Sequence, residues 1–338
     1  MPDLITAREF AEKILRFDDV YILTHAHPDG DTVGTGIALY NLLTALGKRA
    51  AVLCGDSLTH HLEFMRAYAE QDGLYFGNTA DVPFAARHIV SVDVAAAGLL
   101  SGSLCELADK IELALDHHEI NTLPCQELFD EPHSSSAGET FFGVLREAES
   151  ITGKNLLSEK TASALYCAVS SDSGGFQYQS TGARTFRIAA ALTEHGVKVD
   201  EISRRLFDHQ PFTVFCAEAL CTEHARFYHD GKIAVSYMTV ADCKQRHIPD
   251  TDFDTCVQLL RRIEGVEVSA FLKEKEASDT GACRYRVSMR SNEKVNVAEV
   301  CAAFGGGGHA RAAGCTVVGT VDSVTESLCR RIEEQLEK

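Results

Sequence analysis

The 338-residue sequence lacks several signals that would assign it to a broad class of proteins. Its twelve cysteines never form a CxxC pair, which argues against a thiolate zinc site. A chain of this length needs no disulfide scaffold, so we expect reduced, mostly buried thiols. No window approaches the ~18 continuous apolar residues of a membrane span. The N-terminus, MPDLITAREF, lacks the basic and apolar regions of a signal peptide. We therefore expect a cytoplasmic protein with no membrane partner.

Positive charge is also scarce. The chain has 32 lysine and arginine residues against 49 acidic ones, a formal net charge of −17. Affinity for long nucleic acid comes mainly from basic side chains on phosphates, so this balance argues against long nucleic acid, including long duplexes, as a partner. A small phosphorylated substrate held by metals and a few arginines remains compatible with it. Hydrophobic residues make up 45% of the chain, enough for ordinary globular cores, and the length suggests two domains.

Alternating strand and helix signals indicate an α/β fold. Apolar runs predict buried strands at residues 18–25, 49–55, 86–94 and 111–118. Helical patterns occur at residues 31–46, 136–149, 158–170, 182–195 and 198–210. Strands that alternate with helices imply a mainly parallel sheet flanked by helices. Ligands of such folds bind at the carboxyl ends of the strands.

The pattern changes in the C-terminal part. An Asp-Gly turn between alternating runs at residues 225–239 predicts a hairpin. Further strands at 266–275 and 283–291 and a helix near 296–303 predict a smaller α/β domain with a mixed sheet. We therefore expect a domain at residues 1–195, a linker at 196–212 and a domain at 213–338, with a cleft between the domains.

The segment HAHPDGD, residues 25–31, follows the first predicted strand. His25, Asp29 and Asp31 can converge there because the proline and glycine between them bend the chain. Asp31 also lies where the N-cap of the next helix is expected. Taken alone, the two aspartates are as well explained as turn and capping residues.

Other polar groups follow the later strands. Asp93 follows the third strand, and Asp116, His117 and His118 follow the fourth. Asp172 lies in a Ser- and Gly-rich turn after a helix. A lone aspartate at such a place is more often a helix cap or a turn residue. Together, however, carboxylates and imidazoles at one sheet edge form a mixed oxygen and nitrogen site that suits Mn²⁺ or Mg²⁺.

The motifs HAHPDGD, SVDV, DHH and SSDSGGF occur here in the order and spacing of the DHH phosphoesterase superfamily. FGGGGHARAAG, residues 304–314, resembles the glycine-rich motif of its DHH-associated substrate-binding domain. The superfamily includes RecJ-type exonucleases, family II pyrophosphatases, cyclic-dinucleotide phosphodiesterases and nanoRNases. The resemblance covers nearly the whole chain and is closest to the nanoRNase and pAp-phosphatase type.

The resemblance implies a site with two divalent ions, Mn²⁺ first and Mg²⁺ or Co²⁺ as alternatives. One ion would be held by His25, Asp29 and Asp93, and the other by Asp31, Asp93, His117 and Asp172. Asp93 would bridge the ions, Asp116 would orient a histidine, and His118 would face the scissile phosphate. Members usually have asparagine where this chain has His27, so His27 is not counted as a ligand.

The C-terminal motif implies a phosphate-binding site. A bare run such as Gly305, Gly306, Gly307 and Gly308 is by itself best explained as a flexible loop. His309 and Arg311 shift the interpretation, since they add a hydrogen-bond donor and a fixed charge for phosphate. Arg290 resembles a further substrate arginine of the family, and a surface arginine is an equally good explanation for it.

The resemblance therefore implies a hydrolase of short oligoribonucleotides, of linear dinucleotides such as pApA or pGpG, and of 3′-phosphoadenosine 5′-phosphate. A cyclic-dinucleotide phosphodiesterase and a RecJ-like exonuclease are the alternatives within the superfamily. A non-catalytic nucleotide-binding regulator is the alternative from another class, but every expected ligand is present. Members often form homodimers, and nothing in the sequence decides this for the present chain.

Overall fold

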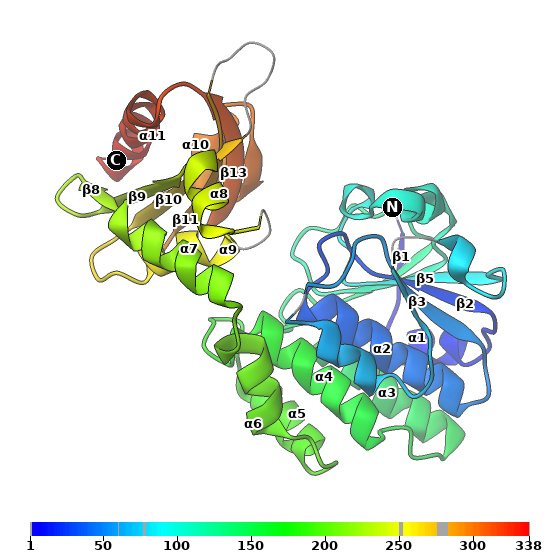
Figure 1. The fold of residues 1–338 in the computed structure, drawn as a ribbon. Coiled ribbons are helices and arrows are strands. Elements are labelled where there is room, and N and C mark those ends of the chain that lie inside the picture. Colours follow the sequence, from blue (N-terminus) through cyan, green and yellow to red (C-terminus); the bar gives the residue numbers. More distant parts are fainter. Residues whose placement is uncertain (1, 60, 77–78, 250–252, 276–282, 338) are drawn as a thin grey trace. The chain divides into compact units, whose positions relative to one another are not determined.

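The computed structural model describes residues 2–59, 61–76, 79–249, 253–275 and 283–337. The chain divides into two compact units, Met1–His209 and Gln210–Lys338. Each unit has its own sheet and its own hydrophobic cores, and Figure 1 shows the elements of each.

The first unit is built on a seven-stranded sheet in which every strand pair is parallel. Its strands are β1 (Asp3–Leu4), β2 (Val20–Leu23), β3 (Ala50–Cys54), β4 (Leu74–Phe76), β5 (His88–Val92), β6 (Leu113–Asp116) and β7 (Glu127–Asp130). They lie in the order β1-β7-β6-β5-β2-β3-β4. From β2 the chain passes to β3 and β4 on one side and then returns to β5 on the other. Ligands of open α/β sheets bind where the strand order reverses in this way.

Apolar side chains cover both faces of this sheet, as is typical of parallel sheets. The α-helices of the unit are α1 (Ala7–Ile14), α2 (Gly30–Ala45), α3 (Ala137–Thr152), α4 (Glu159–Asp172), α5 (Ala183–Thr193) and α6 (Val199–Ser203). Short helical turns are η1 (Glu63–Tyr68), η2 (Thr79–Asp81), η3 (Ala97–Leu99), η4 (Gly102–Lys110) and η5 (Arg204–Asp208). Helices α2, α3 and α4 pack on one face, whereas Leu104 and Ala108 of η4 pack on the other.

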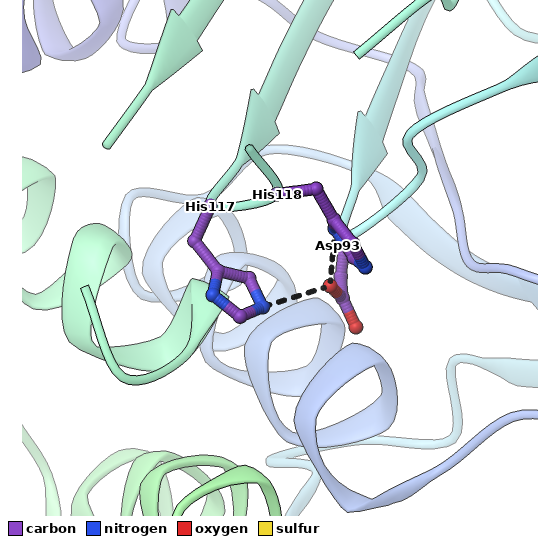
Figure 2. A group of neighbouring side chains, drawn as sticks. All are labelled: Asp93, His117 and His118. Carbon is purple, nitrogen blue, oxygen red and sulfur yellow. Dashed lines mark ion pairs between the residues drawn. The ribbon is translucent and has the colours of Figure 1, made fainter. Parts of the chain in front are cut away.

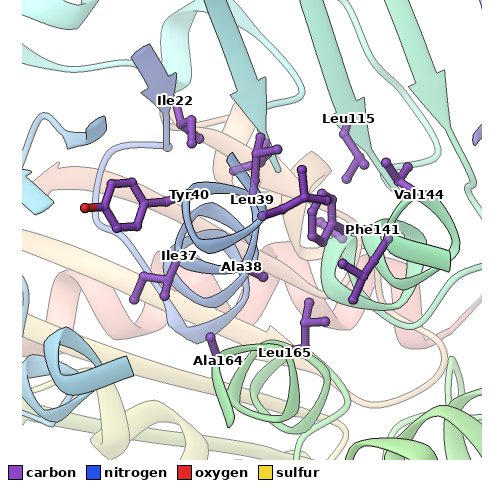
Figure 3. Packing of buried hydrophobic residues seen from close by; sticks show 14 of the residues in the cluster. Ile22, Ile37, Ala38, Leu39, Tyr40, Leu115, Phe141, Val144, Ala164 and Leu165 are labelled. Atoms are coloured by element: carbon purple, nitrogen blue, oxygen red, sulfur yellow. The ribbon is translucent and has the colours of Figure 1, made fainter. Parts of the chain in front are cut away.

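The main core lies between these three helices and the sheet. Figure 3 shows Leu39 of α2, Phe141 of α3 and Leu165 of α4 grouped near Ile22 and Leu115 of the sheet. All five side chains are fully buried. A well-packed core of this kind holds the ends of β2, β5 and β6 in fixed positions.

The second unit has a six-stranded sheet with mixed strand directions. Its strands are β8 (Arg226–Tyr228), β9 (Ile233–Met238), β10 (Val268–Lys275), β11 (Arg284–Ser291), β12 (Gly307–His309) and β13 (Ala312–Val318). They lie in the order β12-β13-β11-β10-β9-β8, and only β9 and β10 pair in parallel among the described residues. The helices are α7 (Phe212–Glu223), α8 (Val240–Arg246), α9 (Asp254–Arg261), α10 (Val297–Ala302) and α11 (Val321–Leu336). One core contains α10 and α11, and another contains α7 and α9.

The predicted fold class is confirmed for both sheets, with local corrections. The four predicted strands correspond to β2, β3, β5 and β6, but the short strands β1, β4 and β7 were not predicted. The single helix expected at 198–210 is instead α6 followed by the wider turn η5. All twelve cysteines are free, and seven are buried. No helix in the described ranges is long and apolar enough to cross a membrane.

Candidate functional site

The predicted ligands of the first unit lie at the carboxyl ends of neighbouring strands. β5 pairs with β2 on one side and with β6 on the other. Residues that directly follow these strands are therefore brought to one edge of the sheet. His25 follows β2, Asp93 follows β5, and His117 and His118 follow β6. The strand order, rather than sequence proximity, brings them together.

The opening turn supplies the N-cap of α2, but by a different residue from the one expected. The cap is Asp29, whose Oδ1 accepts hydrogen bonds from the amides of Asp31 (2.9 Å) and Thr32 (3.0 Å). Asp31 lies in the first helical turn, which corrects its predicted capping role. Asp29 combines the capping role with proximity to an imidazole, since the same Oδ1 lies 3.6 Å from Nε2 of His25.

Asp93 is the central residue of the group. It is 2% exposed and has a left-handed backbone with φ of 59°, which is uncommon for a non-glycine residue and often marks a functional site. Its Oδ2 lies 3.4 Å from Nε2 of His25, and its Oδ1 lies 3.6 Å from Nε2 of His117 and 3.7 Å from Nδ1 of His118. Figure 2 shows both histidines of the β6 end directed at this carboxylate. Within the described part of the chain, its buried Oδ1 has no hydrogen-bond partner.

His25 and His117 turn the same ring nitrogen toward the carboxylates. Nδ1 of His25 lies 2.7 Å from the carbonyl oxygen of Ala26, and Nδ1 of His117 lies 3.3 Å from that of Ser134. A carbonyl can only accept, so each Nδ1 is the donor in these bonds. In the neutral ring this leaves the lone pair on Nε2, the atom that faces Asp93. Both imidazoles are therefore arranged as metal ligands.

Asp31, in the first turn of α2, is fully buried against the N-terminus of α3. Its Oδ2 accepts from the amide of Ala137 (2.7 Å), and its Oδ1 accepts from the amide of Gly138 (2.9 Å) and from the Thr35 hydroxyl (3.2 Å). The first amides of a helix have no partner within the helix and favour an anion. The helix start therefore holds this carboxylate, with Oδ2 3.6 Å from Nε2 of His117. The sequence did not reveal this role of α3.

Both carboxylate oxygens of Asp116 accept hydrogen bonds from neighbouring residues. Its Oδ1 accepts from the amide of His117 (2.8 Å) and from Nδ1 of His118 (2.7 Å). Its Oδ2 accepts from the side-chain amide of Asn121 (2.5 Å). This buried carboxylate thus orients His118 rather than facing the group of ligands. Asn121 was missed, because a single asparagine in a loop carries no distinguishing sequence signal.

Asp172 reaches the group from a helix. It is the last residue of α4, not a turn residue, and its Oδ2 lies 3.4 Å from Nε2 of His117. The described residues thus form three groups whose ligand atoms lie within 4.8 Å of one another: His25, Asp29 and Asp93; Asp31, His117 and Asp172; and Asp93, His117 and His118. Asp93 and His117 each belong to two groups. All six predicted metal ligands are therefore brought together.

The ionisation of these groups is strongly interdependent. Burial disfavours the charged forms of His25 and His117, but the surrounding carboxylates outweigh it and raise their pKa values to about 11 and about 10. Burial and repulsion from Asp93 and Asp172 raise the pKa of Asp31 well above its usual value. Burial raises the pKa of Asp172 to about 6. Burial likewise opposes ionisation of Asp93, yet His117 and His25 hold its pKa well below the usual range.

These residues fit divalent cations. Four carboxylates and two imidazoles in their ligand forms carry four negative charges in a mostly buried space, which is costly without positive charge. Protonated imidazoles are one source of that charge, and bound cations are another. Carboxylate oxygens with imidazole nitrogens suit Mn²⁺ or Mg²⁺, and Oδ1 of Asp93, which accepts no hydrogen bond from the described residues, could also hold an ion.

The glycine run of the second unit is more ordered than a flexible loop. Gly307 and Gly308 belong to β12 and pair with β13. A Cβ on Gly306 would lie 2.2 Å from the carbonyl oxygen of Gly314, and one on Gly308 would lie 2.5 Å from that of Ala312. Gly305 and Gly308 also have positive φ values, 75° and 143°. Close backbone packing thus explains Gly306 and Gly308, and the left-handed backbone explains Gly305, while Gly307 has open space around it.

The other predicted substrate residues lie nearby in the same sheet. Ala312 pairs with His309 of β12 on one side and with Arg290 of β11 on the other. The side chain of His309 lies outside the described part of the structure. Arg290 donates to the carbonyl of Met289 (2.9 Å). Arg311 is exposed and donates to the carbonyls of Glu293 and Val295, so it also braces the loop before α10.

Comparison with known proteins gives matches over both units. The "DHH family, N-terminal domain" matches residues 19–169, and the "DHHA1 domain" matches residues 230–338. The bifunctional oligoribonuclease and PAP phosphatase NrnA of Thermus thermophilus is 27% identical over 323 residues, which cover 94% of this chain and 90% of that protein.

Two further similarities have lower identity. The cyclic-di-AMP phosphodiesterase PdeA of Listeria monocytogenes is 22% identical, over 90% of this chain and 46% of that protein. The crystal structure of an exopolyphosphatase-related protein from Bacteroides fragilis has the same fold, with a TM-score of 0.86 at 22% identity, covering 97% of this chain and 96% of that one. With its DHH and DHHA1 domains, the chain belongs to the DHH phosphoesterase superfamily and is a metal-dependent hydrolase.

Proposed function

We propose that this hydrolase converts short oligoribonucleotides, linear dinucleotides such as pApA or pGpG, and 3′-phosphoadenosine 5′-phosphate to mononucleotides. The observation that carries the proposal is the convergence of three ligand groups on Asp93 and His117. The similarity to an oligoribonuclease and PAP phosphatase along almost the whole chain supports this substrate class. The net charge of −17 favours small substrates over long polyanions.

Each residue of the group has a distinct role in the proposal. His25, Asp29 and Asp93 hold one ion, while Asp31, His117 and Asp172 hold the other together with Asp93. When bound, the ions supply Lewis acidity and an activated water, and Mn²⁺ is our first candidate, ahead of Mg²⁺ and Co²⁺.

Other residues act directly on the substrate or position those that do. Asp116 fixes the ring of His118, whose other nitrogen is then directed at a phosphate oxygen of the substrate. The glycines at 305–308, His309, Arg311 and Arg290 bind the remaining phosphate and sugar groups.

A turnover assay with Mn²⁺ tests the proposal. We would compare 3′-phosphoadenosine 5′-phosphate, pApA, pGpG, cyclic di-AMP and RNA strands of increasing length. We expect efficient hydrolysis of the bisphosphate and linear dinucleotides, with rates that fall as the strand lengthens. Efficient cutting of only the longest strands would instead indicate a RecJ-like exonuclease.

A cyclic-dinucleotide phosphodiesterase is the second candidate, because the Listeria protein with that activity matches 90% of this chain. The same assay separates the two functions. A higher kcat/KM for cyclic di-AMP than for pApA would favour the second candidate over the first.

A further inference from the structure

An exposed group of aromatic rings lies in the first unit, beyond the residues already assigned. We call it the aromatic patch and define it as Phe176, Tyr178, Phe186 and Phe207. Tyr178, Phe186 and Phe207 are 52%, 56% and 49% exposed. Soluble domains seldom leave several large rings exposed together unless the surface binds something. Packing against the main core accounts for Phe176, but neither the core nor the proposed metal ligands account for the three exposed rings.

The patch is joined to the candidate metal centre by one tight turn. The turn starts directly after Asp172, and Ser173 organises it. The Ser173 carbonyl accepts from the amides of Gln177 (2.9 Å) and Tyr178 (3.0 Å), and its hydroxyl accepts from the amide of Phe176 (3.0 Å). These three bonds hold the backbone of Tyr178 close to the end of α4. The backbone that carries this ring is therefore fixed relative to the end of α4, where Asp172 lies.

Two glycines of this turn allow the rings to lie against the backbone. A Cβ on Gly174 would lie 2.4 Å from Cζ of the Tyr178 ring, so this ring lies directly over the glycine. A Cβ on Gly175 would lie 3.5 Å from the Phe207 ring. Both glycines have left-handed backbones, with φ of 58° and 69°. The turn that follows Asp172 thus packs under the Tyr178 ring and beside the Phe207 ring of η5.

A third exposed ring joins the patch through a partly buried one. Phe186 of α5 stacks on Phe176, with ring centroids 5.6 Å apart and an interplanar angle of 23°. Phe176 also contacts the buried Tyr166 of α4, at 5.9 Å between centroids. Phe186 is therefore supported from the core through Phe176 and presents a preformed flat surface.

We infer that the aromatic patch is a stacking platform for a nucleobase of the substrate. This inference rests on the proposed function, because it assumes a nucleotide whose phosphate faces the metal ligands. A nucleotide carries its base one sugar away from its phosphate, so rings one turn from Asp172 are within reach of the base. Aromatic stacking tolerates any base, and it favours substrates with bases over inorganic or sugar phosphates.

Steady-state kinetics on two matched substrates test the inference. One is pApA, and the other has the same sugar-phosphate backbone without bases. We expect Tyr178→Ala and Phe186→Ala each to raise KM for pApA about tenfold. An effect of this order is typical when the aromatic side chain that stacks on one base is replaced by alanine. KM for the abasic substrate should not rise with it. Equal effects on both substrates, or none on either, would overturn the inference.

Two further variants separate stacking from general damage. Tyr178→Phe keeps the ring and should recover most of the affinity lost in Tyr178→Ala. Ile151 is 38% exposed on the last turn of α3, at the opposite end of that helix from Asp31, so Ile151→Ala is a matched control for the loss of exposed apolar surface. A KM increase in this control as large as in Tyr178→Ala would contradict a specific platform.

Ligand affinity measured by calorimetry tests the platform without requiring that the protein hydrolyse any substrate. Wild-type protein should bind adenosine 5′-monophosphate about tenfold more tightly than ribose 5-phosphate, and Tyr178→Ala should lose the difference. Protein that shows this preference but hydrolyses no substrate would refute the proposed function and leave the platform standing. Equal affinity for the two ligands would refute the platform. If the patch instead joins two copies of the chain, the protein should bind the two ligands equally well. The molecular mass of the protein in solution should then change in Phe186→Ala.

Discussion

Asp93 shows how much of the centre can depend on one residue. It contacts His25 through one oxygen and approaches His117 and His118 with the other. We predict that Asp93→Asn reduces kcat by more than the roughly hundredfold typical for loss of a group that supports a metal ligand. Asparagine is the informative change because it tolerates the left-handed backbone at φ of 59° and keeps the shape. Asp200→Asn is the control, because Asp200 is exposed on α6. Near-wild-type activity of Asp93→Asn would refute the two-ion assignment.

Asn121 illustrates a residue that acts through another. Its amide donates to Asp116, which in turn holds His118. We predict that Asn121→Ala lowers kcat about ten- to hundredfold, since supporting groups of this kind commonly have effects of that size. The affinity for Mn²⁺ should change little, because Asp116 does not face the ligand groups. Calorimetry with Mn²⁺ alongside kinetics checks both parts, and a large loss of Mn²⁺ affinity with unchanged kcat would reverse the assigned role.

At the level of elements, the strands that carry the site were the ones the sequence could predict. β2, β3, β5 and β6 are buried on both faces, so each appears as a continuous apolar run. β1 has only two residues, both exposed, and β4 has three, so neither has a usable pattern. The neighbours of β5 in the sheet are likewise set by tertiary packing. The sequence therefore indicated which residues end strands and that these ends share one edge of a parallel sheet, but it did not indicate which strands are neighbours.

Helices α2 and α4 approach closely because of small residues. A Cβ on Gly34 of α2 would lie 2.4 Å from the carbonyl oxygen of Ala164 and 3.0 Å from the Cβ of Ala168. We predict that Gly34→Ala lowers the free energy of unfolding by about 1–3 kcal/mol, the usual cost of overpacking, although alanine favours helix. Gly143→Ala in α3 is the matched control, since the nearest atom would be 4.0 Å away. That variant should gain up to about 1 kcal/mol in the same denaturant titration. Equal changes in the free energy of unfolding for Gly34→Ala and Gly143→Ala would show that helix propensity, and not packing between α2 and α4, determines the effect at Gly34.

At the scale of the whole molecule, negative charge is concentrated where the first unit is most buried. Asp31 and Asp93 both lie 3.6 Å from the same imidazole nitrogen, Nε2 of His117, and are almost inaccessible to water. Their repulsion raises the free energy of the fold, and bound cations can offset it when His25 and His117 are in their neutral ligand forms. The stability of the unit should therefore be linked to divalent cations, because the unfolded chain does not bring these ligands together.

This linkage gives a prediction for the intact protein. At a concentration of Mn²⁺ a hundredfold above its Kd, binding to the folded state should add about 2.7 kcal/mol per site. For a unit of this size, that corresponds to a rise in Tm on the order of 5–10 °C. Thermal unfolding with Mn²⁺, with a chelator, and with K⁺ at equal ionic strength measures the effect. Asp93→Asn should lose most of the rise, because Asp93 contributes to both ligand sets. If K⁺ raised Tm as much as Mn²⁺, the effect would be screening, and the group would be a network of ion pairs rather than a metal centre.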